Sequence, residues 1–402
     1  MVLLDPLIAL VVSFILLAAM LYKRVSIGIA LVSSAIILSL LSMNPTDVVR
    51  VFFETTIDPI TGSLVLVTFG IMLLSLLYKE TQTLESLSRS LSGILKNPKL
   101  IISTLPAIIG LLPVPGGALM SAPLVETEAE KLGLKKDKKT YVNVWFRHII
   151  FPVYPMSQVL ILAVALTGAS IISIIIRQIP VVAAMTVVGY FAVLKKANVA
   201  NDNAIQETKL QENLRIFLIS FSPIFVMILT VVIFRVDVSI AAFVGITLLV
   251  LITKPRRQIL VKTITNVAVY KIALAAYGAM LLRSATMASG VSVVLGQKIA
   301  MWNVNEVALL ATLPAVLGFL VGSPAGGIAI SVPIMAGIVN FTSNSASLLY
   351  ISAYLGYLVA PTHLCLALTA DYFKCPLSKV YKFLIPSLVV SFAVALLIYY
   401  IM

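Results

Sequence analysis

Long apolar runs separated by short polar segments dominate the chain. A run of roughly 20 apolar residues can cross a bilayer as a helix. Runs near this length fall at about 6–22, 25–43, 60–78, 141–168, 172–194, 216–234, 238–253, 263–282, 347–373 and 380–401. The pattern therefore predicts an all-α polytopic membrane protein with ten spans.

Two further apolar stretches are interrupted near their centres. Pro-Gly-Gly interrupts the first, and Pro-Ala-Gly-Gly interrupts the second. Each interruption leaves arms of roughly 9 to 15 residues, which are too short to cross a bilayer. We therefore expect two re-entrant hairpins, at about 99–131 and 307–339.

An internal repeat organises these elements. Similar segments recur in the same order: TLPAIIG at 104–110 with TLPAVLG at 312–318, GIMLL at 70–74 with GAMLL at 278–282, Pro155 with Pro361, and Pro180 with Pro386. We infer two halves, 1–200 and 216–402, joined by a cytoplasmic linker at 201–215. Five crossings in each half is an odd number, so the two halves should be inverted-topology repeats, as in many secondary transporters.

Composition and charge support this arrangement and exclude others. The chain is 60% hydrophobic and only 11% charged, whereas soluble domains carry roughly 25% charged residues. The net charge of +13 comes from short loops and not from a basic face, so we expect no nucleic-acid partner. Most basic loops share one side of the bilayer if both termini lie outside. We predict a multi-pass protein of a prokaryotic plasma membrane.

The hairpin tips and two matched helix breaks are the candidate site. The breaks are FPVYPMSQV at 151–159 and VAPTHLC at 359–365. Proline and glycine interrupt helical hydrogen bonds, and such backbone survives at membrane depth only inside protein or beside a wet cavity. Free helix ends can then bind ions. Proline kinks in ordinary spans are the alternative, but the pairing of the interruptions in two halves favours a site.

Ionisable residues within apolar sequence are further candidates, because their burial in a membrane is costly. Arg147 and His148 precede the first break, and His363 lies in the second. Arg147 either serves the site or extends to the cytoplasmic headgroups. His363 either has a structural role or handles substrate or protons. Asp371 is the best intramembrane carboxylate and a candidate coupling-ion ligand. Asp371 and Lys271 either form an ion pair, act as a proton relay or lie at the interface.

Signatures of enzymes and of resident cofactors are missing. The sequence has no Walker loop, no His-Glu-x-x-His and no Gly-x-Ser-x-Gly, so we do not expect an enzyme. Cys365 and Cys375 have only His363 nearby in sequence, which is too few ligands for a structural zinc site. We expect no cofactor or metal, apart from Na⁺ or H⁺ as a coupling ion.

The tips PVPGG and SPAGG, each followed by a broken span, resemble the ion transporter superfamily. TLPA…PGG and APTHLCLALTADYF look closest to an uncharacterised integral-membrane family within it. The resemblance implies substrate and sodium sites at tips and breaks, a homodimer, and an elevator-type movement. The resemblance implies roles for Pro115, Gly116, Gly117, Ser121, Ser157, Ser323, Gly326, Gly327, Thr362 and His363. Gln158 of the first break and the ionisable residues Arg147 and Asp371 complete the candidate set. The candidate substrate-binding residues are Pro115, Gly116, Gly117, Arg147, Ser157, Gln158, Gly326, Gly327, Thr362 and His363, and the candidate coupling-ion residues are Ser121, Ser323, Thr362 and Asp371.

These observations predict a secondary active transporter of a small anion, of the organic acid class, coupled to Na⁺ or H⁺. A cation/proton antiporter that uses His148, His363 or Asp371 is the main alternative. A lipid flippase or membrane-embedded enzyme is a more remote one.

Overall fold

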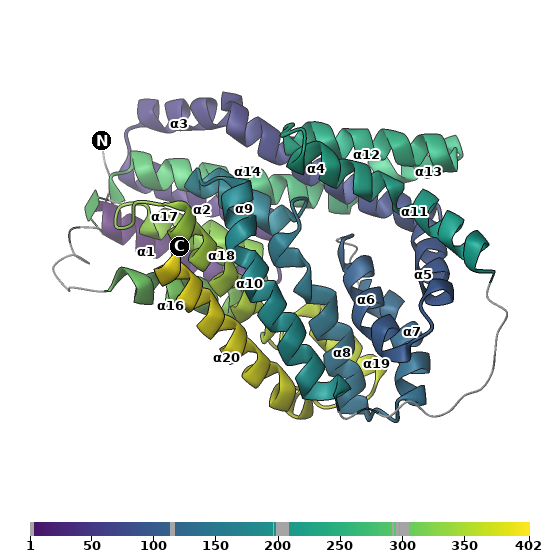
Figure 1. Ribbon diagram of the computed structural model, residues 1–402. Coiled ribbons are helices and arrows are strands. Elements are labelled where there is room, and N and C mark those ends of the chain that lie inside the picture. Colours follow the sequence, from purple (N-terminus) through teal and green to yellow (C-terminus); the bar gives the residue numbers. More distant parts are fainter. Residues whose placement is uncertain are drawn as a thin grey trace. The chain divides into compact units, whose positions relative to one another are not determined.

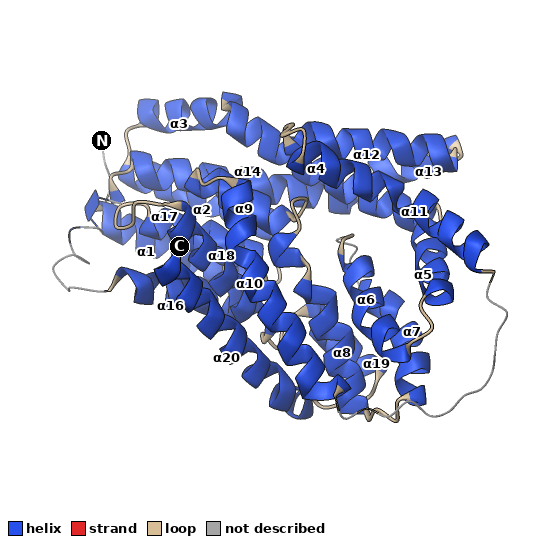
Figure 2. Ribbon diagram, in the orientation of Figure 1, coloured by secondary structure: helices blue, strands red, loops and turns tan. Residues whose placement is uncertain are grey.

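The computed structural model describes residues 4–112, 117–195, 197, 209–291, 293–294, 297 and 305–402. Within these ranges every regular element is a helix and no strand occurs (Figure 2). The prediction of an all-α protein is confirmed.

Among the described residues, six helical stretches are long and apolar enough to cross a membrane: Pro59–Glu80, Lys136–Thr167, Ile171–Leu194, Leu210–Val232, Arg257–Ala288 and Leu377–Ile401. This confirms the coarser prediction of a multi-pass helical membrane protein. Three other predicted spans are the shorter helices α1 (Pro6–Tyr22), α2 (Ile27–Ser42) and α12 (Val238–Thr253). At 1.5 Å per residue these helices are about 24 to 26 Å long, slightly less than a hydrocarbon core of about 30 Å. The total of ten spans stays a prediction.

Polar residues and prolines at the helix starts explain where many helices begin. Asp5, Asn97, Asn266 and Asn305 each accept hydrogen bonds from the first turn of the helix that follows, which satisfies donors that no helical carbonyl can reach. Proline opens several helices, where its missing N–H has no consequence. These include α1, α3 (Pro45–Ile57) and α6 (Pro98–Gly110).

The chain forms two compact units, and each unit combines segments from both halves of the sequence. The first unit contains residues 1–70, 158–174 and 266–357, and the second contains 71–157, 175–265 and 358–402. Three helices contribute residues to both units: α4 (Pro59–Glu80), α10 (Ile171–Gly189) and α18 (Ser343–Leu358). The divisions after residues 157 and 357 fall in or beside the two predicted helix breaks.

In the first unit, α14 (Val267–Ala288) packs against α2, α3 and α17 (Pro324–Met335) (Figure 1). The close approach of α14 to α2 depends on Gly28, because a Cβ atom there would lie 2.7 Å from the backbone nitrogen of Ala275. Helices α16 (Glu306–Val321) and α17 form a helical hairpin, and α17 also contacts α9 (Gln158–Thr167). The second hairpin therefore packs against the second arm of the first broken span.

In the second unit, α8 (Lys136–Ile149) is central, and every residue from Lys139 to Ile149 is buried. It contacts α6, α7 (Gly117–Lys131), α19 (Leu364–Tyr372) and α20 (Leu377–Ile401). The first hairpin, α6 and α7, therefore packs against the first arm of one broken span and the second arm of the other. This unit also contains α5 (Thr83–Ile94), α11 (Leu210–Val232), α12 and α13 (Arg257–Ile264).

Two features differ from the sequence prediction. Helix α11 begins at Leu210, so the last part of the predicted linker 201–215 is helical; Gln211, Glu212 and Asn213 are compatible with a solvated helix and conceal its start from an apolar pattern. Helix α3 lies in a segment with no predicted span. It is an amphipathic helix with polar residues on one face and apolar residues on the other, and a search for continuous apolar runs does not detect such a pattern.

Candidate functional site

Arg147, on α8, lies close to both arms of the first hairpin. A Cβ atom added to Gly110, at the end of α6, would lie 2.5 Å from the carbonyl oxygen of Arg147. A Cβ atom added to Gly117, at the start of α7, would clash with Nη2 of the guanidinium and lie 3.1 Å from Cζ. The two glycines thus leave room for the arginine, and the guanidinium lies beside the N-terminal end of α7.

This guanidinium is buried, and the described residues supply no counter-charge for it. Arg147 is 2% exposed, so its side chain does not reach the surface of the protein. Contact with the lipid headgroups would require it to do so. In the described part of the chain, no carboxylate pairs with it and Nη1 has no hydrogen-bond partner. Lys139, two turns earlier on α8, differs because its Nζ lies 2.8 Å from Glu130 and 3.9 Å from Glu126.

A buried polar network supports the hairpin beside this guanidinium. Ser121 donates a hydrogen bond to Oδ1 of Asn143 at 2.7 Å. Nδ2 of Asn143 donates to the Ala118 carbonyl at 3.0 Å and to Oγ1 of Thr369 at 3.1 Å. The network connects α7, α8 and α19, one turn of α8 before Arg147. Ser121, predicted as a coupling-ion ligand, therefore has an established structural partner.

The two histidines of the chain meet in the second unit. His148 and His363 are buried, and their ring centroids are 4.7 Å apart in an edge-on arrangement. Nδ1 of His148 lies 2.6 Å from the Val144 carbonyl, and Nδ1 of His363 lies 3.3 Å from the Leu358 carbonyl. The two histidines thus come together from opposite halves of the sequence. Their role in a functional site stays a prediction.

The second hairpin has a tight tip in the first unit. Gly322 adopts a positive φ of 65°, and Ser323 is the N-cap of α17, where its hydroxyl accepts a hydrogen bond from the Gly326 N–H at 3.3 Å. Gly327 packs against the α16 backbone, because a Cβ atom there would lie 2.8 Å from the nitrogen of Gly318. Ser323 and Gly327 therefore have structural roles at positions where the sequence suggested ligand contacts.

The remaining predicted residues are dispersed. Ser157 is buried at the end of the first break, and Nε2 of Gln158 donates to the Thr68 carbonyl at 3.3 Å. Thr362 is exposed in the second break, and Asp371 is exposed in the last turn of α19. The predicted tip residues Pro115 and Gly116 lie outside the described residues.

A family model matches residues 5–402, almost the entire chain. Its description is "Protein of unknown function (DUF401)". The chain belongs to this family. A comparison with curated proteins finds no match. The family description assigns no activity, so the function has to be inferred from the site.

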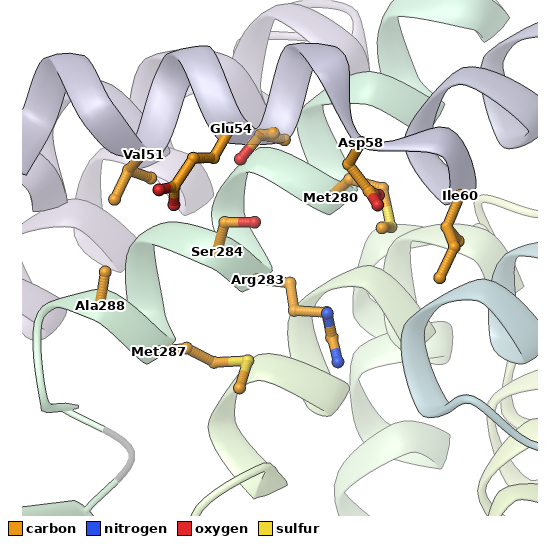
Figure 3. Close-up of a pocket in the computed structure, with 10 residues that line it drawn as sticks. Val51, Glu54, Asp58, Ile60, Met280, Arg283, Ser284, Met287 and Ala288 are labelled. Atoms are coloured by element: carbon orange, nitrogen blue, oxygen red, sulfur yellow. The ribbon is translucent and has the colours of Figure 1, made fainter.

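A second candidate lies in the first unit, where α3, the start of α4 and α14 line a cavity of about 560 Å³ (Figure 3). Glu54 and Asp58 come from one side of the cavity and Arg283 from the other. Burial by itself raises the pKa of Asp58. Hydrogen bonds from Thr61 and the charge of Arg283 outweigh this effect, so the pKa of Asp58 lies below the ordinary aspartate value. Because this cavity contains charges of both signs, it gives a weaker signal for one class of ligand than Arg147 does.

Sequence reasoning missed Asn143 and Thr369. Asn143 is a polar residue in an otherwise apolar part of α8, four residues before Arg147, so the helical period of 3.6 could have placed both on one face. Thr369 carries no such signal, because threonine is common in membrane helices and its partner lies in a distant segment.

Proposed function

We propose that the chain is a secondary active transporter of a small anion, of the organic acid class. The single observation that supports this most directly is the buried guanidinium of Arg147, which has no carboxylate partner in the described chain. A buried charge normally requires a partner. A substrate anion can supply the missing charge and leave when transport is complete.

The surroundings of Arg147 match an anion in two ways. The guanidinium presents a planar set of donors that can hold a carboxylate through two parallel hydrogen bonds. The N-terminal end of α7, at Gly117, adds backbone N–H groups and a partial positive charge. Because Gly117 has no Cβ atom, the guanidinium can lie directly against this helix end.

The second half of the chain supports a functional role for Arg147 over a role in folding. Gly110 of the first hairpin faces the carbonyl oxygen of Arg147, and the repeat partner Gly318 faces the carbonyl oxygen of Ala353 in the same way. The packing of hairpin against broken span is thus similar in both halves, yet the second half uses alanine where the first has arginine. Packing alone does not require the arginine.

The helix order supports the inverted-repeat architecture that we propose for alternating access. A hairpin, a broken span and a long closing helix occur in the order α6 to α10 and again in the order α16 to α20. Each compact unit takes one hairpin together with arms of both broken spans. An elevator-type movement, a homodimer, both termini outside and coupling to Na⁺ or H⁺ belong to the same proposal.

Uptake into proteoliposomes tests the proposal. Vesicles should accumulate a radiolabelled organic acid when an inward Na⁺ or H⁺ gradient is imposed. Arg147→Gln should abolish uptake, and Arg147→Lys, which keeps the charge but not the planar donor set, should reduce it. Arg50→Gln is the matched control, because Arg50 is exposed and pairs with Asp47 at 3.0 Å on α3. Absence of uptake for every acid under both gradients, or full uptake by Arg147→Gln, would overturn the proposal.

The orientation can be tested separately by cysteine labelling. A cysteine at Asp137, in the first turn of α8, should react with a membrane-impermeant maleimide only when the reagent is added from the cytoplasmic side. Reaction from the outside alone would reverse the proposed topology and leave the anion site untouched.

A further inference from the structure

We propose that the second unit contains a transition-metal site formed by His148, His363 and Cys365. One nitrogen of each imidazole and the Cys365 sulfur all lie within 4.8 Å of one another. His148 is in the last turn of α8, His363 is the N-cap of α19, and Cys365 is in its first turn. The proposal is independent of anion transport, because metal binding can be measured on purified protein in the absence of flux.

The hydrogen bonds of both histidines orient the rings for metal binding. Nδ1 of His148 and Nδ1 of His363 each face a backbone carbonyl, those of Val144 and Leu358. A carbonyl only accepts hydrogen bonds, so these contacts favour the tautomer in which each Nδ1 is protonated and Nε2 has the lone pair. Metal-ligating histidines in proteins are commonly oriented in this way, with the second ring nitrogen bonded to a carbonyl or carboxylate.

The spacing of the three donors suits one small ion. Bond lengths of about 2.0–2.1 Å to nitrogen and 2.3 Å to sulfur place tetrahedral ligands about 3.3–3.8 Å apart. The donor atoms all lie within 4.8 Å of one another. The separation between any two of them therefore has to decrease by at most about 1.5 Å to reach tetrahedral metal geometry. Cys365 is only partly buried, and His363 lies in the break between α18 and α19, so both can adjust without disturbing a helix interior.

The donor set selects the class of ion. Two imidazoles and a thiolate favour Zn²⁺, Co²⁺ or Cu⁺, whereas Na⁺, Mg²⁺ and Ca²⁺ prefer oxygen ligands. The thiol loses its proton on metal binding, and its negative charge reduces the repulsion between the ion and the neighbouring guanidinium of Arg147. Three protein ligands leave a fourth position for water or a small anion.

Cobalt absorption tests the site directly. Protein freed of its affinity tag and stripped with a chelator is titrated with Co²⁺. We expect visible bands of tetrahedral cobalt and a near-ultraviolet band from thiolate to cobalt, which saturate at one ion per chain and disappear when Zn²⁺ is added. Cys365→Ser should remove the thiolate band, and His148→Gln and His363→Gln should remove stoichiometric binding.

Cys375 is the matched control, because it is the other cysteine of the chain and lies after α19 with its sulfur 3.6 Å from the Pro376 carbonyl oxygen. Cys375→Ser should bind cobalt like the unchanged protein. A thiolate band that is absent from the unchanged protein, or that persists in Cys365→Ser, would refute the site.

A second measurement does not depend on the folding of the ligand variants. In Cys375→Ser, where Cys365 is the remaining thiol, Zn²⁺ should slow maleimide labelling at least tenfold, and Mg²⁺ should have no effect. Equal labelling rates with and without Zn²⁺ would exclude the proposed site.

Discussion

Replacing Arg147 with methionine should stabilise the unliganded protein and remove its response to anions. Methionine keeps an apolar stem of similar length but places no charge at this buried position. In the described chain the guanidinium has no carboxylate partner, so the folded state bears a desolvation penalty that substrate does not offset when it is absent. This sign is unusual, because most substitutions of buried residues are destabilising.

The magnitude follows from the neighbours of Arg147. The C-terminal turn of α8, to which Arg147 belongs, favours a cation by about 0.3–1 kcal/mol. The N-terminal end of α7, next to Gly117, opposes it by a similar amount, so the two helix ends nearly cancel. Replacing buried ion pairs with apolar residues of similar volume is often neutral or stabilising by about 1–4 kcal/mol, and an unpaired buried charge lacks even the attraction that such a pair provides. We expect Arg147→Met to raise the free energy of unfolding within that range.

Thermal unfolding in detergent measures both effects. Without ligand, Arg147→Met should unfold at a higher temperature than the unchanged protein. With a transported anion at 100 times its Kd, the unchanged protein should gain about 2.7 kcal/mol, while the variant should gain nothing. A lower unfolding temperature for unliganded Arg147→Met, together with no protection of the unchanged protein by any organic acid, would refute the reasoning.

Three further predictions concern the second hairpin and the α3–α14 cavity, and each is measured by unfolding in detergent. Gly327→Ala should destabilise the protein by about 1–3 kcal/mol, because the new Cβ atom overlaps the α16 backbone. The control is Gly62→Ala, whose Cβ atom meets no atom within 4 Å; it should be neutral or stabilising by up to about 1 kcal/mol. Equal effects of the two substitutions would contradict the packing argument. Ser323→Ala should lose about 1 kcal/mol with its cap, whereas Ser26→Ala, an N-cap without a side-chain hydrogen bond, should lose little; a loss confined to Ser26 would be contrary evidence. The lowered pKa of Asp58 should stabilise the folded protein fully above the ordinary aspartate pKa, and this contribution should be lost as the pH falls through the lower folded-state pKa. Asp58→Asn should therefore be less stable than the unchanged protein at pH 7 and equally stable in strong acid. A stability difference that is constant at all pH values would show that ionisation of Asp58 is not its cause.

Much of the helical architecture could be predicted from local pattern. The Pro-Ala-Gly-Gly motif at 324–327 predicted a helix interruption, and the structure has the break directly before it, with a left-handed Gly322 and the capped start of α17 at Ser323. Pro155 and Pro361 predicted the two breaks, and α8 and α18 end before them. Apolar run length, missing N–H groups and glycine torsions act within a few residues, so they can be inferred without knowledge of packing.

The roles of individual site residues were less predictable. Ser323 and Gly327 were predicted at a ligand, and in the structure Ser323 caps α17 while Gly327 packs against the α16 backbone; their contact with a ligand stays a prediction. Ser121 was expected to bind a coupling ion, and its hydroxyl bonds to Asn143. A short motif specifies that a hydroxyl or a glycine is present at a tip, but the neighbouring helix determines whether that group faces a cavity or a second backbone.

The chain's hydrophobic pattern was sufficient to establish a helical membrane protein with paired interruptions, because the bilayer limits each crossing to a narrow range of lengths. The convergence of Arg147 with the hairpin ends at Gly110 and Gly117, and of His148 with His363, became evident from the packed helices. These contacts join segments from different parts of the sequence, and their geometry depends on how α6, α7, α8 and α19 pack together. Local propensity carries no information about such packing, so only the folded chain showed that, among the described residues, no carboxylate pairs with Arg147.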